Sequence, residues 1–198
     1  MRGGAKATGR IIRSAFSSVP LLRVLSVVVL PVVVVMGCAP GEAPPGSPGT
    51  PAPDYAAPTM GGDTVALIDL REDVVLLNIW ATWCAPCRVE MPHLQALHEE
   101  LGGAGLRIVG VSVDSEGARG TVQRFAGDLG IDFLILLDPA ERVSRLFGAY
   151  GVPLNVLIDR EGIIAWRQSG PITADDPILR RTLGELLPQD GAAAADAF

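Results

Sequence analysis

The sequence predicts an α/β fold built on a central mixed, mainly parallel sheet flanked by helices. Two nearly continuous apolar runs, "VVLLNIW" (74–80) and "LRIVGVSVD" (106–114), are typical of strands buried on both faces. Helical stretches separate the successive strands, and this alternation favours parallel pairing. The turn "REG" (160–162) joins the last two strands, which we expect to pair antiparallel.

We expect one folded domain from about residue 54 to residue 188. Its elements are, in order, a short edge strand at 64–70, a strand at 74–80, a helix at 85–101 ended by Gly102 and Gly103, a strand at 106–114, a helix at 117–129 closed by Gly130, a strand at 133–137, a short helix at 139–148, strands at 154–159 and 163–168, and a helix at 175–187. Residues 189–198 are expected to form a disordered tail.

The first 37 residues have the build of a secretory signal peptide. They carry five basic side chains and no acidic one, and an apolar run, "VLSVVVLPVVVVMG", precedes Cys38. This run is shorter than the roughly 20 residues that cross a bilayer, and Pro31 interrupts it. A retained anchor helix is the alternative.

The segment "VMGC" (35–38) resembles the lipobox of bacterial lipoproteins, whose cysteine becomes lipidated. The resemblance implies acyl chains on Cys38 and a protein anchored to a membrane of the bacterial cell envelope, outside the cytoplasm. A soluble secreted protein is the alternative. Residues 39–53 contain six prolines and three glycines, so we expect residues 38–53 to be a lipidated cysteine followed by a semi-rigid tether.

Removal of the signal peptide makes the chain strongly acidic. Residues 38–198 keep 11 basic side chains against all 22 acidic ones, a formal net charge of −11. No basic cluster remains, which argues against nucleic acid as a partner.

With Cys38 assigned to lipid, Cys84 and Cys87 remain as a pair in "WCAPC". Cys84 lies where the strand gives way to the helix, and Cys87 lies in the first helical turn. Unpaired N–H groups at a helix start stabilise a thiolate. We expect an exposed, nucleophilic Cys84 and a sheltered Cys87 that shares the core-facing side of the helix with Met91 and Leu94.

Two other uses of this pair are weaker. A structural zinc site needs four ligands, whereas the chain offers one cysteine pair, with His93 and His98 expected at the surface. A purely structural disulfide that closes so small a loop would constrain the unfolded chain little. We therefore expect a reversible Cys84–Cys87 disulfide, with no metal and no cofactor.

The runs "VVLLNIWATWCAPCRVEMPHLQAL", "GLRIVGVSVD" and "YGVP" resemble the TlpA/ResA-like thiol-disulfide oxidoreductases, an extracytoplasmic branch of the thioredoxin superfamily. The resemblance covers residues 54–187 and implies a thioredoxin-like fold. Pro153 matches the cis-proline loop that faces the disulfide, which would leave the backbone of Val152 free to pair with an extended substrate. The expected substrate-binding residues are Trp83, Ala85, Pro86, Val152 and Pro153.

The resemblance also gives Glu90 a catalytic role, because a glutamate three residues after the second cysteine is a hallmark of this branch. A partly desolvated carboxylate with a raised pKa can accept the proton of Cys87. Asn78 stands where thioredoxin has a buried aspartate and cannot titrate. A plain surface glutamate is the alternative. Leu154 and Asn155 depart from the two threonines usual in the branch, which leaves the substrate preference open.

The resemblance implies a protein-disulfide reductase, expected to be a monomer. It further implies a membrane thiol electron donor of the CcdA/DsbD type and disulfide-bearing envelope substrates such as apocytochrome c, hence a role in cytochrome c maturation. The alternatives are a disulfide oxidase or isomerase, a peroxide-reducing redoxin, and a non-catalytic binding module.

Overall fold

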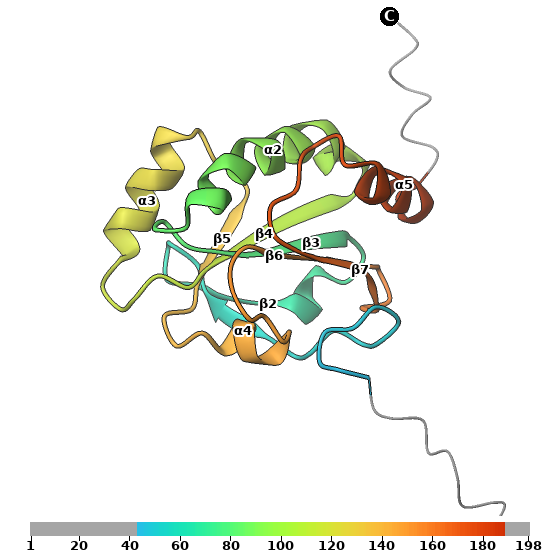
Figure 1. Cartoon of the computed structure of the whole chain (residues 1–198), viewed down its shortest axis with the longest axis horizontal. Coiled ribbons are helices and arrows are strands. Elements are labelled where there is room, and N and C mark those ends of the chain that lie inside the picture. The colour runs from blue at the N-terminus through green and yellow to red at the C-terminus, as the bar shows by residue number, and fades with distance from the viewer. Residues whose placement is uncertain (1–42, 189–198) are drawn as a thin grey trace, which may run out of the picture. The chain divides into compact units, whose positions relative to one another are not determined.

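The computed structural model describes residues 43–188 (Figure 1). The predicted signal peptide (1–37), the lipidation site Cys38 and the predicted tail (189–198) lie outside the described residues. No helix in the described part of the chain is both long and apolar enough to cross a membrane.

The central sheet has five strands in the order β5-β4-β3-β6-β7. Their bounds are β3 (Val74–Trp80), β4 (Leu106–Ser112), β5 (Leu134–Leu137), β6 (Leu154–Ile158) and β7 (Ile164–Ser169). β3 pairs parallel with β4, and β4 pairs parallel with β5, whereas β6 pairs antiparallel with both β3 and β7. The prediction of a mixed, mainly parallel sheet is therefore confirmed.

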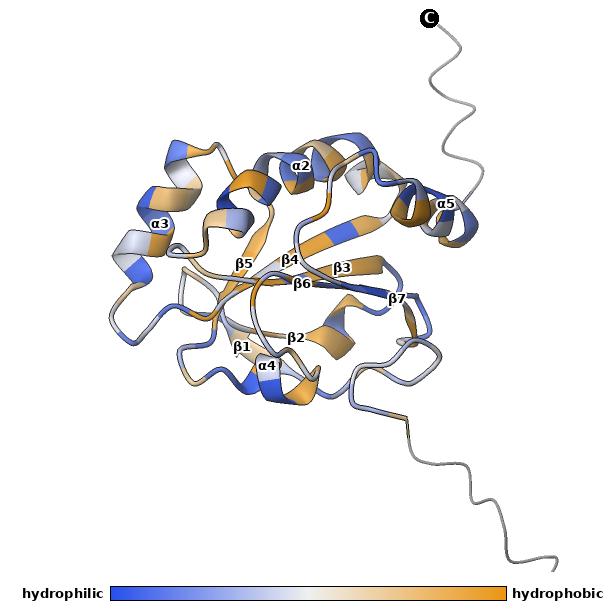
Figure 2. Ribbon diagram, in the orientation of Figure 1, coloured by the Kyte–Doolittle hydropathy of each residue, from blue (hydrophilic) through white to orange (hydrophobic). Residues whose placement is uncertain are grey.

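Helices cover both faces of this sheet. They are α2 (Ala85–Leu101), α3 (Arg119–Asp128), α4 (Arg142–Leu146) and α5 (Pro177–Leu186). α2, α3 and α5 lie on one face, and α4 lies on the other (Figure 1). Every residue of β3 and β6 is buried, and hydrophobic residues gather on β3, β4 and β5 (Figure 2). β3 therefore runs through the core, and the chain that follows Trp80 leads directly to the start of α2.

The N-terminal part of the domain differs from the prediction. Instead of an edge strand at 64–70, β2 (Thr64–Ala66) pairs with β1 (Ala56–Pro58) in a separate two-stranded sheet, and a 3-10 helix, η1 (Leu67–Leu70), follows. The side chain of Asp69 accepts a hydrogen bond from Ala66 N (3.1 Å). This bond closes the helical turn and ends the strand, which an apolar pattern alone does not reveal.

The predicted tether also joins the fold earlier than residue 54. Gly49 N donates to Ile164 O (2.8 Å), Ile164 N donates to Thr50 O (2.9 Å), and Ala52 N donates to Gly162 O (2.9 Å). The prolines lack N–H groups, but the residues between them pair with the outer edge of β7. The prediction of a free tether up to residue 53 is wrong for this segment.

Candidate active site

Cys84 and Cys87 form a disulfide at the N-terminus of α2, with 5.3 Å between their Cα atoms. Cys84 is the N-cap residue, and its sulfur accepts a hydrogen bond from Cys87 N (3.1 Å). When the bond is reduced, the same N–H group and the helix dipole favour a thiolate at Cys84. The predicted placement of the pair at a strand-to-helix junction is confirmed.

Cys84 is less accessible than the sequence suggests. It is 4% exposed and Cys87 is fully buried, so the prediction of an exposed Cys84 is wrong for the oxidised protein. The reason is the chain segment in front of it: the Cys84 sulfur lies 3.6 Å from Val152 O. The residues beside Cys84 form the exposed surface at this point: Trp83 is 69% exposed, and Ala85 and Pro86 are also exposed.

The Val152–Pro153 peptide bond is cis, as the resemblance implies. Pro153 O accepts a hydrogen bond from Gly170 N (2.9 Å), which ties this loop to the end of β7. In the described residues, neither the N–H nor the carbonyl of Val152 takes part in a backbone hydrogen bond. The edge that faces the disulfide is therefore free to pair with an extended polypeptide.

Glu90 lies one turn beyond Cys87 and is 1% exposed, which excludes the surface alternative. Its carboxylate accepts three hydrogen bonds: Asn155 Nδ2 (2.6 Å) and Ile172 N (2.8 Å) donate to Oε1, and Asn78 Nδ2 (2.9 Å) donates to Oε2. Burial raises the pKa of Glu90 to about 7, and the three donors oppose that rise. A carboxyl that titrates near neutrality can both accept and release a proton.

Sequence reasoning missed two of these donors. It treated Asn155 only as a departure from the usual threonines, and it gave Ile172 no role. Asn78 and Asn155 are register partners on β3 and β6. That register joins positions far apart in the chain, and only knowledge of the β3–β6 pairing could have revealed it.

A second buried carboxylate holds the loop before the cysteines. Asp114, two residues beyond the end of β4, accepts hydrogen bonds from Thr82 Oγ1 (2.6 Å), Thr82 N (3.0 Å) and Ser112 Oγ (2.8 Å). Because Thr82 stands two residues before Cys84, these bonds fix the path of the chain into α2.

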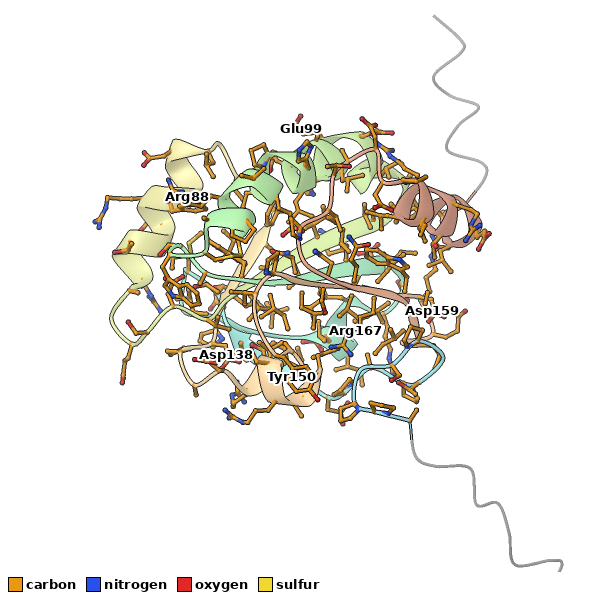
Figure 3. The ribbon with its side chains drawn as sticks, viewed as in Figure 1. Arg88, Glu99, Asp138, Tyr150, Asp159 and Arg167 are labelled. Carbon is orange, nitrogen blue, oxygen red and sulfur yellow. A yellow bond between two sulfur atoms is a disulfide. The ribbon has the colours of Figure 1, made fainter. Side chains whose placement is uncertain are left out.

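Arg88 belongs to α2, and its side chain extends toward α3 (Figure 3). Its guanidinium stacks over the Phe125 ring, 5.0 Å from the centroid, and donates to Thr82 O (3.5 Å). His93 and His98 are half-buried, and His98 Nε2 lies 3.5 Å from Asp132 Oδ1. No group of three or more potential metal ligands occurs among the described residues.

The similarity of this chain to known proteins agrees with the geometry of the site. Residues 48–167, more than half of the chain, match the AhpC/TSA family. The chain belongs to the AhpC/TSA family. This stretch includes both cysteines, Glu90, the cis peptide bond and both asparagines.

Relatives of this AhpC/TSA protein are thiol-disulfide oxidoreductases by name. It is 33% identical to thiol-disulfide oxidoreductase ResA of Geobacillus thermodenitrificans over 128 residues, 65% of this chain and 72% of the relative. The structure of a thiol:disulfide interchange protein DsbE, assigned as putative, from Chlorobium tepidum matches with a TM-score of 0.65 at 31% identity, over 71% of this chain and 97% of that one.

A secreted thiol-disulfide isomerase from Corynebacterium glutamicum matches with a TM-score of 0.62 at 28% identity, over 73% of this chain and 94% of that one. These structures confirm the thioredoxin-like fold. With the Cys84–Cys87 disulfide in place, the protein is a thiol-disulfide oxidoreductase of the ResA/DsbE type.

Proposed function

We propose that this protein reduces protein disulfides outside the cytoplasm while anchored to a membrane through lipid on Cys38. The observation that carries the proposal is the disulfide at the start of α2, which faces the free backbone of Val152 and has the buried carboxyl of Glu90 one turn further along the helix. Trp83, Ala85 and Pro86, exposed beside the disulfide, and the Val152–Pro153 loop are the surfaces that would contact a substrate.

The reaction proceeds by two thiol-disulfide exchanges. The Cys84 thiolate attacks one sulfur of the substrate disulfide, which forms a mixed disulfide and releases the other substrate sulfur as a thiolate. Cys87 then attacks the Cys84 sulfur and gives its proton to the Glu90 carboxylate. The second substrate sulfur leaves, the substrate gains two electrons, and the Cys84–Cys87 disulfide returns.

Repeated turnover needs a reductant, because compartments outside the cytoplasm are kept oxidising. The resemblance to the TlpA/ResA-like branch supports a membrane thiol donor of the CcdA/DsbD type and substrates such as apocytochrome c, whose cysteine pair must be reduced before haem attaches. The lipobox-like segment that ends at Cys38 and the word "secreted" in the name of one structural relative support the location.

Substrate trapping tests this function. Cys87→Ser leaves Cys84 able to attack but removes the group that resolves the mixed disulfide, so the variant is expected to accumulate covalent complexes with envelope proteins that reductant releases. Cys84→Ser is the matched control and should trap none. Recovery of no complex with Cys87→Ser would support a non-catalytic binding module instead.

The direction of transfer is tested by the reduction potential of the Cys84–Cys87 pair, measured against glutathione. The isomerase name of one structural relative makes the opposite direction the second candidate. A reductase requires a low potential, and a value as oxidising as about −120 mV would contradict the proposal. A peroxide-consumption assay on the purified protein tests the alternative that it is a peroxide-reducing redoxin.

A further inference from the structure

The 198-residue chain contains only two asparagines, Asn78 and Asn155, and both donate a hydrogen bond to Glu90. They are cross-strand partners on β3 and β6, and both are fully buried. Two amide side chains therefore lie side by side in the core next to one turn of α2, where apolar residues would be the ordinary choice.

The hydrogen bonds around Glu90 suit a carboxylate and not a carboxylic acid. Three N–H groups point at its two oxygens, and within residues 43–188 no hydrogen-bond acceptor faces either oxygen to receive a proton from it. Asn78 Nδ2 also donates to Asn155 Oδ1 (2.9 Å), which holds the two amides together. Asn78 Oδ1 is buried without a partner among the described residues, so the arrangement favours donation to Glu90 over full pairing of the amide.

No nearby charge assists these donors. In the described part of the chain, no arginine, lysine, histidine or second carboxylate hydrogen-bonds or ion-pairs with Glu90 from α2, β3, β6 or the loop at 170–172. On its own helix, Arg88 and His93 stand two and three residues away and neither hydrogen-bonds nor ion-pairs with Glu90, and Cys87 can titrate only when the disulfide is reduced. The balance between desolvation and hydrogen bonding therefore decides whether Glu90 is ionised.

We propose that Asn155 is a positioning residue that acts together with Asn78 to keep the buried Glu90 carboxyl ionisable, so that it can receive the proton of Cys87. This inference deepens the proposed function and rests on the role given there to Glu90. Asn155 Nδ2 also donates to Gly170 O (3.3 Å), in the same loop as Ile172. An amide has two N–H hydrogens for these two acceptors, whereas the hydroxyl of the threonine usual in the resembling branch has one.

The test follows the titration of Glu90 by carboxyl ¹³C NMR in the oxidised full chain, where no exchange reaction occurs. Asn155→Leu removes the N–H donor to Glu90 and keeps an apolar side chain in its place, so that water stays excluded from the site. It should move the midpoint upward from near neutrality by about one pH unit or more, because the charged form then loses one of its three hydrogen-bond donors. Asn155→Thr keeps one donor and should give a smaller shift in the same direction.

Gln95→Leu is the matched control. It removes another buried amide from the face of α2, one that bonds to Glu99 and Asp132 and not to Glu90. It should lower stability without moving the Glu90 midpoint. An unchanged midpoint in folded Asn155→Thr or Asn155→Leu protein would overturn the inference.

A second measurement separates this inference from the proposed function. The rate of mixed-disulfide resolution in Asn155→Leu should fall about fivefold at pH 7 for the first unit by which the Glu90 midpoint rises, and about tenfold for each further unit, because the ionised fraction falls by these factors. If the midpoint moves and the rate does not, Asn155 positions Glu90 as inferred, and the proton-accepting role of Glu90 is wrong.

Discussion

At the scale of single residues, burial gives the Glu90 carboxyl chemistry that an exposed glutamate lacks. Its pKa of about 7 divides it nearly evenly between base and acid at neutral pH. Cys87, one turn earlier, is fully buried and has no solvent to take its proton. Their positions support the proton transfer from Cys87 to Glu90 that we propose for the second exchange.

Glu90→Gln is expected to slow mixed-disulfide resolution about 100-fold at pH 8, because it removes the proton acceptor while it keeps the shape of the side chain. The dependence of the rate on pH around 7 should also disappear. Stopped-flow measurement of resolution from pH 5 to 9 gives both quantities. Glu99→Gln, an exposed position on the same helix, is the control; an unaltered profile in Glu90→Gln would remove Glu90 from the mechanism.

Local pattern was enough to place Cys84 and Cys87 at the start of a helix, and the resemblance to the TlpA/ResA-like branch singled out Glu90 three residues later. Neither was enough for Asn155 and Ile172, which reach Glu90 from 65 and 82 residues away in sequence. The position of Cys84 at the helix start was predicted correctly, but its exposure was not, because the loop around Val152 covers its sulfur. Contacts between distant segments depend on strand register, which a single sequence does not specify.

At the scale of elements, long apolar runs made β3 and β4 predictable to within a few residues, and Gly102 and Gly103 marked the end of α2. The short elements β5 and α4 lie within the predicted ranges 133–137 and 139–148, but β1 was missed and η1 stands where a strand was predicted. Composition also gave a wrong prediction for residues 49–52. Proline content indicates that a segment is stiff, but it does not show which acceptors the remaining N–H groups bind.

A pair of glycine substitutions tests whether the proline-rich segment belongs to the folded domain. Gly46 and Gly49 both have positive φ angles, +73° and +83°. A Cβ on Gly46 would lie 2.6 Å from Phe147 O, whereas a Cβ on Gly49 would meet nothing within 4 Å. Both changes to alanine carry a backbone cost of about 1–2 kcal/mol, and only Gly46→Ala adds a clash.

Gly46→Ala should therefore lower the free energy of unfolding by more than Gly49→Ala, by about 1 kcal/mol or more. Urea unfolding of the two variants measures the difference. Equal stability of both variants with the unsubstituted protein would show that the segment does not pack against the domain.

At the scale of the whole molecule, the raised pKa of Glu90 links stability to pH. The folded-state pKa is about 7, compared with an ordinary value of 4.5. The protonated form is therefore favoured by folding: its stabilisation is fully present below pH 4.5 and is lost as the pH rises through 7. Burial of the Glu90 carboxyl thus lowers the stability of the folded protein at neutral pH, where the proposed proton transfer would take place.

The oxidised protein should lose about 3 kcal/mol of unfolding free energy from this group between pH 4.5 and pH 8. Other carboxylates add their own dependence, and Glu100, whose pKa is lowered by the hydrogen bonds from Arg180, contributes with the opposite sign. The difference between the protein and Glu90→Gln isolates the Glu90 contribution. Parallel stability curves for the two proteins across this range would contradict it.

The stretch from residue 50 to residue 59 runs from one margin of the sheet to the other, with Pro51 bridged to Ile163 next to β7 and Thr59 bridged to Leu136 on β5. It interrupts the row of unpaired peptide groups that each outer strand would otherwise present, and this makes it harder for another chain to extend the sheet at these edges. The backbone of Val152 makes no backbone hydrogen bond among the described residues and lies beside the Cys84 sulfur, so under the proposed function it offers an incoming polypeptide a pairing site next to the reacting atom. The wrapped segment meanwhile shields part of each sheet margin from unwanted association.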